Sequence, residues 1–174
     1  MARNHPLPLV WLLSDARNDA WLDTALPALP ANSGFVFRHY HLHGEERARR
    51  YHHLREIAWT HGHRVILAGN DDWPCDGRYD RRPAPGGLFL ASAHDGDELE
   101  RAARAGADGI FLSPVFATRS HPGAGRLGVH GFHVLAQRSP VPVIALGGMS
   151  PGRAAELAWP RWGAIDGLEP APRA

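Results

Sequence analysis

Residues 88–116, LFLASAHDGDELERAARAGADGIFLSPVF, contain the pattern that decides the fold. An apolar run over residues 88–92 predicts a buried strand, and an amphipathic pattern over residues 97–105 predicts a helix that ends at Gly106. A second apolar run over residues 109–115 predicts the next strand. A strand, a helix and a strand joined by short turns are typical of a parallel βαβ unit.

The same alternation extends to both sides of this stretch. Further strands are predicted over residues 9–14, 35–41, 64–68, 141–146 and 164–168, and further helices over residues 21–29, 45–61, 132–138 and 153–159. Eight strands result when the polar residues 76–79 are counted. We therefore predict an α/β fold, a (β/α)8 TIM-type barrel. It is expected to be shortened, with outer helices missing near strand 4 and after strand 8. An open doubly wound sheet is the alternative.

Composition limits the function classes. The 174 residues, 44% of them hydrophobic, predict one domain over residues 1–168 and a Pro-rich tail over residues 169–174. The net charge of +1 and the scattered arginines predict no nucleic-acid partner and no membrane surface. The sequence contains no lysine, which excludes Schiff-base chemistry and a Walker-type phosphate loop. The single cysteine, and the lack of a leader or spanning segment, predict a cytoplasmic location.

Residues that follow the predicted strands are the candidates for a site, because the carboxyl ends of parallel strands build it in either architecture. These residues are Asp15, Arg38, Tyr40, Asn70, Asp71, Ser92, His94, Ser113, Pro114, Gly147, Gly148, Asp166 and Gly167. The pair Gly147-Gly148 offers backbone amides that approach a phosphate without obstruction by side chains.

Four segments in a fixed order resemble one known family. They are Ser92-Ala93-His94, Ala105-Gly106-Ala107-Asp108, Ser113-Pro114-Val115-Phe116-Ala117-Thr118 and Pro142-Val143-Ile144-Ala145-Leu146-Gly147-Gly148-Met149. Together they resemble the thiamine phosphate synthase/TenI family, and the resemblance covers residues 10–168. It implies a transferase of thiamine biosynthesis that joins a pyrimidine diphosphate to a thiazole phosphate, while Mg²⁺ holds the departing diphosphate.

The resemblance also implies residue roles. Arg38 matches the family's strand-2 arginine, and Asp71 matches an aspartate that binds magnesium. The implied catalytic residues are His94, Ser92 and Arg38. The implied substrate-binding and phosphate-binding residues are Tyr40, Asn70, Thr118, Arg119, His121, Gly147 and Gly148. The implied ligand is a small phosphorylated heterocycle, and formation of a homo-oligomer is left open.

The sequence departs from the family pattern at four positions. Tyr40 and His121 stand where the family has lysine, and the acidic magnesium ligand after strand 4 has only Asp80 as its nearest candidate. Asp166 places a carboxylate where a phosphate is expected, which would repel it. Two alternatives follow. One is a TenI-like thiazole tautomerase that uses His94 as a metal-independent acid/base, and the other is a non-catalytic barrel that binds thiamine precursors.

His39, His41 and His43 alternate along the predicted second strand. If Arg38 and Tyr40 face the barrel interior, these histidines face the outer helices or solvent. We therefore do not expect them to form a metal site.

Overall fold

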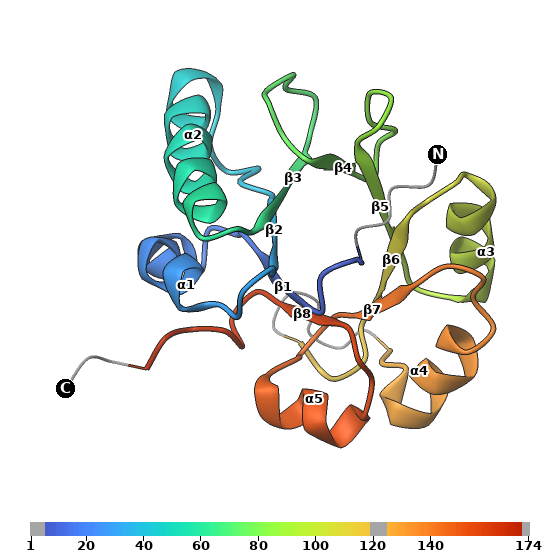
Figure 1. Cartoon of the computed structure of the whole chain (residues 1–174). Coiled ribbons are helices and arrows are strands. Elements are labelled where there is room, and N and C mark those ends of the chain that lie inside the picture. Colours follow the sequence, from blue (N-terminus) through green and yellow to red (C-terminus); the bar gives the residue numbers. More distant parts are fainter. Residues whose placement is uncertain (1–5, 119–124, 172–174) are drawn as a thin grey trace.

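A computed structural model describes residues 6–118 and 125–171. Its elements are, in order, β1 (Val10–Leu13), a short 3-10 helix η1 (Asp19–Trp21), α1 (Leu22–Ala28), β2 (Gly34–Phe37), α2 (Gly44–Thr60), β3 (Arg64–Ala68), β4 (Gly77–Tyr79), β5 (Leu88–Ala93), α3 (Gly96–Arg104), β6 (Gly109–Leu112), α4 (Gly128–Ala136), β7 (Val143–Ala145), α5 (Pro151–Leu157) and β8 (Trp162–Ala164). The strands pair in sequence order, all parallel, and β8 returns to β1 (Figure 1). The predicted TIM-type barrel is confirmed, and the open sheet is wrong.

The outer layer of helices is incomplete around β4. Figure 1 shows α1 and α2 on one flank of the barrel, α3 on the other, α4 and α5 between them, and no helix beside β4. Residues 69–76 and 80–87 connect β4 to its neighbours without a helix, and none follows β8 in residues 165–171. The predicted shortening is confirmed, with a helix missing on both sides of β4. No helix in the described ranges is long and apolar enough to cross a membrane.

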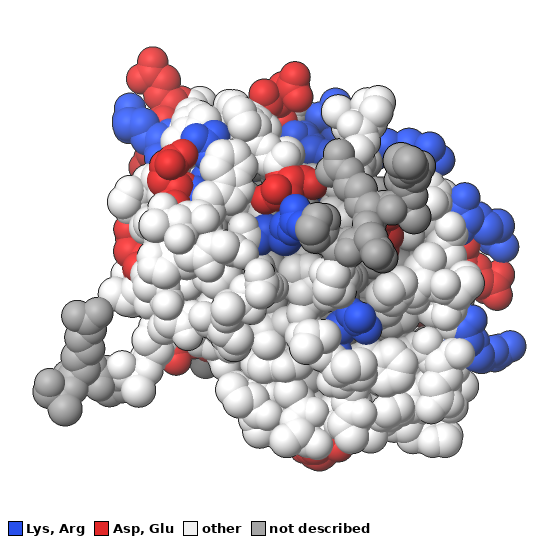
Figure 2. Space-filling model, in the orientation of Figure 1, with Lys and Arg blue, Asp and Glu red and all other residues white. Residues whose placement is uncertain are grey.

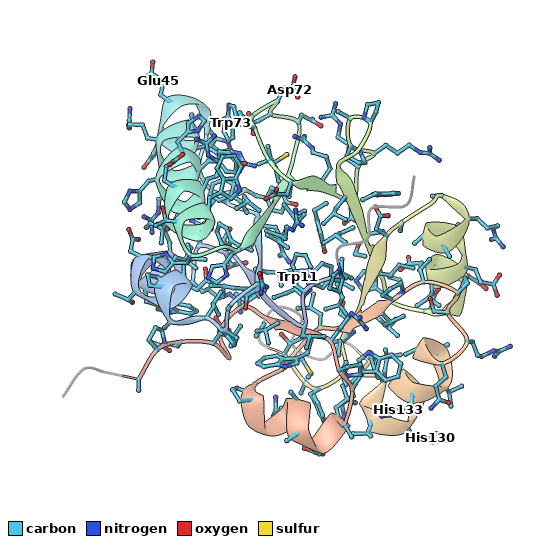
Figure 3. The ribbon with its side chains drawn as sticks, in the orientation of Figure 1. Trp11, Glu45, Asp72, Trp73, His130 and His133 are labelled. Atoms are coloured by element: carbon cyan, nitrogen blue, oxygen red, sulfur yellow. The ribbon has the colours of Figure 1, made fainter. Side chains whose placement is uncertain are left out.

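Alternate residues of the strands fill the barrel interior, as the period of two in a strand requires. Trp11 is completely buried there, with its ring edge-on to Phe111 at a centroid distance of 5.7 Å (Figure 3). Gly34 on the neighbouring strand makes room for this ring, because a Cβ at that position would overlap it. The opposite faces of the strands, including Phe35 and Phe37, pack with α1 and α2. The interior is therefore a packed core, and ligands are confined to the ends of the barrel.

Polar contacts replace a helix along β4. Arg78 is buried and donates hydrogen bonds of 2.6 Å to the backbone oxygens of Gly69 and Asp71. Trp73 stacks on Tyr51 of α2 at 5.0 Å, and Figure 3 places it beside that helix. Residues 69–76 are thus tied both to β4 and to α2, which closes the barrel wall where no helix covers it.

Several predicted strands end earlier in the structure than expected, and the difference is largest, at four residues, for β2 and β8. The last strand is Trp162–Ala164 and not residues 164–168, because the carbonyl of Ile165 accepts a hydrogen bond from the Asn18 side chain and the chain leaves the sheet. β2 ends at Phe37, four residues earlier than predicted. Side chains nevertheless continue to alternate between the two faces of the sheet beyond β2, since His39 stacks on Phe37 on the helix side. The face expected for His39 is confirmed.

Both signs of charge are mixed over the molecular face seen in Figure 2. Charged groups of both signs lie over the upper and right-hand parts of this view, and the lower left part is mostly uncharged. This pattern matches the near-neutral net charge of +1 and gives that face no extended basic patch of the kind that binds nucleic acid.

Candidate functional site

A cavity of about 820 Å³ lies at the carboxyl ends of the strands. Its lining residues are Arg17, Arg38, Tyr40, Tyr79, Ser92, His94, Ser113, Pro114, Ala117, Thr118, Gly125, Leu146, Gly147, Gly148, Met149, Ser150, Arg153, Ala164, Ile165, Asp166 and Gly167. This size and the mixture of apolar walls with a few polar groups are typical of a small-molecule site.

The cavity brings together seven of the eleven residues to which the family resemblance assigns a role. They are Arg38, Tyr40, Ser92, His94, Thr118, Gly147 and Gly148. Asn70 and Asp71 are not among its lining residues. Arg119 and His121 lie outside the described residues. The chemical roles of these residues stay predictions, but seven of them share one cavity, as expected from their positions at strand ends.

Arg38 brings a positive charge to the cavity wall. Its Nε is buried and has no hydrogen-bond partner among the described residues. Its guanidinium lies 5.9 Å from the ring centroid of Tyr79, whose pKa is raised to about 12 by burial, so that this phenol stays neutral. The backbone N–H of Arg38 donates to Ser14 Oγ at 2.7 Å. A guanidinium whose buried Nε has no partner among the described residues is suited to meet an anion.

The turn after β7 requires its two glycines. Gly147 and Gly148 have φ angles of +91° and +65°. A Cβ on Gly147 would lie 2.6 Å from Pro114 Cα, and one on Gly148 would lie 2.5 Å from the oxygen of Ala117. The turn can therefore approach the loop after β6 only without side chains. Arg153 of α5 donates a hydrogen bond to the Gly148 oxygen, which adds a second arginine to the cavity wall.

Arg17 is a third cavity arginine, and sequence reasoning missed it together with Arg153. Arg17 pairs with Asp15 at 3.0 Å and with Asp166 at 3.2 Å. Burial raises the pKa of Asp15, but the hydrogen bonds and charge of Arg17 outweigh it and hold that pKa below its usual value. The expected repulsion between Asp166 and a phosphate is offset by this pairing. The available signal for Arg17 was its position two residues after the strand end at Asp15.

His94 has a carboxylate partner that the sequence analysis did not nominate. Its Nδ1 lies 2.8 Å from Glu98 Oε2, and its backbone N–H donates to the same oxygen at 2.8 Å. The hydrogen bond from the His94 side chain lowers the pKa of Glu98, so that Glu98 is a carboxylate at neutral pH. Nδ1 is then the donor of the pair, and Nε2 is left for a ligand. The signal was the spacing of four residues at the start of α3.

Asp71, the predicted magnesium ligand, is held by an arginine of α2. Its Oδ2 accepts a hydrogen bond of 2.9 Å from Nε of Arg47, whose side chain is 8% exposed. Arg47 also donates to the oxygens of His39 and Ala68 at 2.7 Å each. Asp71 does not line the cavity, and this buried guanidinium binds its carboxylate, while its role as a metal ligand stays a prediction.

The other candidate carboxylate is also engaged by the protein. Asp80 accepts hydrogen bonds from the backbone N–H of Ser92 at 2.6 Å and from its hydroxyl at 2.8 Å. Magnesium requires carboxylate oxygens and waters in near-octahedral geometry. Asp71 Oδ2 and both oxygens of Asp80 accept hydrogen bonds from protein donors, so in this arrangement neither carboxylate has both oxygens available to a metal ion. The magnesium assignment stays a prediction, and no chemical step below depends on it.

Comparison with known proteins identifies the family. The model of the thiamine monophosphate synthase family matches residues 55–164, which is more than half of the chain. The chain belongs to this family. The matched range includes Ser92, His94, Thr118 and the Gly147-Gly148 turn, whereas Arg38 and Tyr40 precede it.

Curated relatives of the family align with part of the chain. A thiamine-phosphate synthase of Chloroflexus aurantiacus is 34% identical over 93 residues, which is 53% of this chain and 42% of the relative. A thiamine-phosphate synthase of Methanocella arvoryzae is 36% identical over 94 residues, 53% of this chain and 43% of the relative. The alignments thus span less than half the length of these relatives.

Solved structures support the family's fold over almost the whole chain. A thiamine phosphate pyrophosphorylase from Pyrococcus furiosus superposes with a TM-score of 0.74 at 18% identity and covers 94% of this chain and 90% of that one. A geranylgeranylglyceryl phosphate synthase from Thermoplasma acidophilum superposes with a TM-score of 0.60 at 8% identity, covering 94% and 87%. At these identities the likeness shows the barrel fold alone.

Proposed function

We propose that this chain is a thiamine phosphate synthase-type transferase, which joins a pyrimidine diphosphate to a thiazole phosphate and releases diphosphate. The observation that supports it is the combination of Arg38, with its unpartnered buried Nε, and the Gly147-Gly148 turn in one cavity of a member of this family. The cavity of about 820 Å³ has room for two small heterocycles side by side.

The reaction is a substitution at carbon. The thiazole ring nitrogen gives its electron pair to the methylene carbon of the pyrimidine substrate, and the bond from that carbon to the diphosphate oxygen breaks. The electrons of this bond leave with the diphosphate, so negative charge grows on it in the transition state. Arg38 is charged at all relevant pH values and stabilises that charge, while Thr118 and the Gly147-Gly148 amides hold the thiazole phosphate.

Formation of thiamine phosphate from the two purified substrates, followed by mass spectrometry, tests this function. Arg38→Met is expected to lower turnover by about 100- to 1,000-fold, since it removes a charge aimed at the leaving group. Arg49→Met is the matched control, because the Arg49 side chain is 73% exposed on α2. Absence of product from the wild-type protein, with and without Mg²⁺, contradicts the proposal.

The pair of His94 and Glu98 supports a second candidate, a thiazole tautomerase. In this reaction His94 Nε2 moves a proton on the ring of a thiazole carboxylate phosphate, and Glu98 holds Nδ1. His94→Asn is expected to lower isomerisation by about 100- to 10,000-fold with little change in ligand affinity. Isomerisation by the wild-type protein without thiamine phosphate formation favours this candidate over the transferase, and absence of both activities favours a binding protein.

A further inference from the structure

A chain of hydrogen bonds runs behind Arg38, on the side of the sheet away from the cavity. The backbone N–H of Arg38 donates to Ser14 Oγ at 2.7 Å, and Ser14 Oγ lies 2.7 Å from Nδ1 of His39. Nε2 of His39 lies 2.8 Å from Oδ1 of Asp19. Ser14 and His39 are completely buried, so water does not compete for these bonds.

Asp19, at the end of this chain, is held by α2. Arg50 donates from Nε to Asp19 Oδ1 and from a terminal nitrogen to the Asp19 backbone oxygen, both at 2.7 Å. The hydrogen bonds from His39 and Arg50 lower the pKa of Asp19 against the raising effect of its burial, so Asp19 is a carboxylate that can only accept. The far end of the chain is therefore a fixed acceptor.

The number of available protons fixes the direction of every bond. Ser14 Oγ already accepts from Arg38, and in the described residues its hydroxyl has no other partner than His39. The hydroxyl proton must therefore be donated to Nδ1 of His39. A neutral His39 then carries its proton on Nε2, from which it is donated to Asp19. Only this arrangement gives the Ser14 hydroxyl proton and both ring nitrogens of His39 a hydrogen-bond partner.

We propose that Ser14, His39 and Asp19 form a relay that positions Arg38, and that His39 is the positioning residue within it, with its proton on Nε2. The inference rests on the proposed function, because its consequence is the affinity of the cavity for a diphosphate. Arg38 directly follows β2, where the sheet no longer fixes its backbone. The bond to Ser14 replaces the missing ladder contact and so sets where the guanidinium points.

The relay also makes anion binding sensitive to pH. The groups that face His39 are Asp19 of η1, His41 of the following turn, and Arg50 and Arg47 of α2. Burial lowers the pKa of His39, more than the hydrogen bond to Asp19 raises it. His39 is thus neutral at pH 7 and gains a proton only below its usual range. A proton on Nδ1 faces the Ser14 hydroxyl proton, so the hydroxyl must turn and Ser14 Oγ then accepts from both His39 and Arg38, which changes the direction of the bond that holds Arg38.

Two variants of His39 separate positioning from packing. The amide of Asn lies where Nδ1 lies in histidine and can accept from Ser14, whereas the amide of Gln reaches the place of Nε2 and keeps only Asp19. Both variants lose the ring that stacks on Phe37 at 4.6 Å. We expect His39→Gln to bind inorganic diphosphate about 10-fold more weakly than wild type, and His39→Asn to bind within about 2-fold, by titration calorimetry at pH 7.5.

The pH dependence is measured as the ratio of two diphosphate affinities at each pH, that of the wild type and that of His39→Asn. Protonation of diphosphate changes both affinities equally and so does not change their ratio. Wild-type affinity divided by His39→Asn affinity is expected to fall as pH decreases from 7 to 5, because only the wild-type acceptor can be protonated. A constant ratio contradicts the relay. So does equal weakening of binding in both variants, which is the result of lost packing, or an unchanged affinity in both.

The tautomer of His39 is measured without any ligand. Nitrogen-15 NMR of the wild-type protein at pH 7.5 is expected to show the proton of His39 on Nε2, and a proton on Nδ1 overturns the relay. Zn²⁺ bound through Nε2 also overturns it, since ligand atoms of Asp19, His39 and His41 lie within 4.8 Å of one another. A wild-type protein that binds no diphosphate contradicts the proposed function, whereas binding that is equal in all variants contradicts the positioning role alone.

Discussion

The substitution Asp71→Asn tests whether the Asp71 carboxylate stabilises the fold or binds a metal ion. The substitution keeps the shape of the side chain and removes its charge opposite Arg47, whose side chain is 8% exposed. Breaking a fully buried ion pair costs about 3–5 kcal/mol. Asp71 is 35% exposed and Arg47 keeps its two backbone acceptors, so we expect the smaller loss of about 1–2 kcal/mol in the free energy of unfolding. For a chain of this length the melting temperature falls by about 3–6 °C.

The assay combines two measurements on the same samples. Urea unfolding gives the loss of stability, and calorimetry with inorganic diphosphate, with and without Mg²⁺, gives the affinity, which is expected to be unchanged. Asp72→Asn is the matched control, because Asp72 is the exposed neighbour of Asp71. A variant with wild-type stability that no longer shows a Mg²⁺-dependent gain in diphosphate affinity would refute this reasoning and restore Asp71 as a metal ligand.

Three other predictions test the site and the core. Gly148→Ala is expected to lower stability by at least about 2 kcal/mol and to weaken phosphate binding, owing to its positive φ and the contact with the Ala117 oxygen. Gly152→Ala, where a Cβ meets nothing within 4 Å, is its control in the same denaturation and binding assays. Trp11→Ala is expected to cost about 3–5 kcal/mol in urea unfolding, and a loss below 1 kcal/mol would contradict its place in the core. Burial raises the pKa of Tyr79 to about 12 above an ordinary value near 10, so it contributes stability below pH 10 that is lost as pH rises towards 12. Ultraviolet titration of wild type against Tyr79→Phe measures the raised pKa, and urea unfolding of both proteins as a function of pH measures the loss of stability.

The βαβ unit over residues 88–116 was predictable because its local signals agree. Leu88–Ala93 and Gly96–Arg104 match the predicted strand and helix within one residue at each end. Asp95 caps the helix by accepting from the Glu98 N–H at 2.8 Å, and Gly106 follows it with a φ of +84°. Apolar spacing, an N-cap and a terminal glycine are all local features, so a sequence displays them directly.

The strand β4 was the least certain prediction for a physical reason. Its central residue, Arg78, is buried through hydrogen bonds to two backbone oxygens and not through an apolar side chain. A hydrophobic pattern cannot reveal a residue that is buried in this way. Only the count of eight strands and the shape of a closed barrel indicated it.

Contacts between distant side chains are the part of the site that the sequence did not predict. Arg47 reaches Asp71 across 24 positions, and Arg17 reaches Asp166 across 149. Both pairs depend on how α2 and the strand ends come together, which neither motif nor periodicity specifies. Residues at strand ends were predictable because topology alone places them at one end of the barrel, whereas the partner of each charge was not.

The strands β3, β4 and β5, which have no helices between them, influence the order of folding. β3 pairs Ile66 with Gly77, and β4 pairs Gly77 with Leu88, so each parallel pairing there joins residues only 11 positions apart. The pairing of Ile110 with Val143, between β6 and β7, spans 33 positions. Closing a loop one third as long saves about 1 kcal/mol of chain entropy. The three strands without intervening helices thus have the lowest entropic barrier to pairing, and the barrel is expected to nucleate from them and close last between β8 and β1.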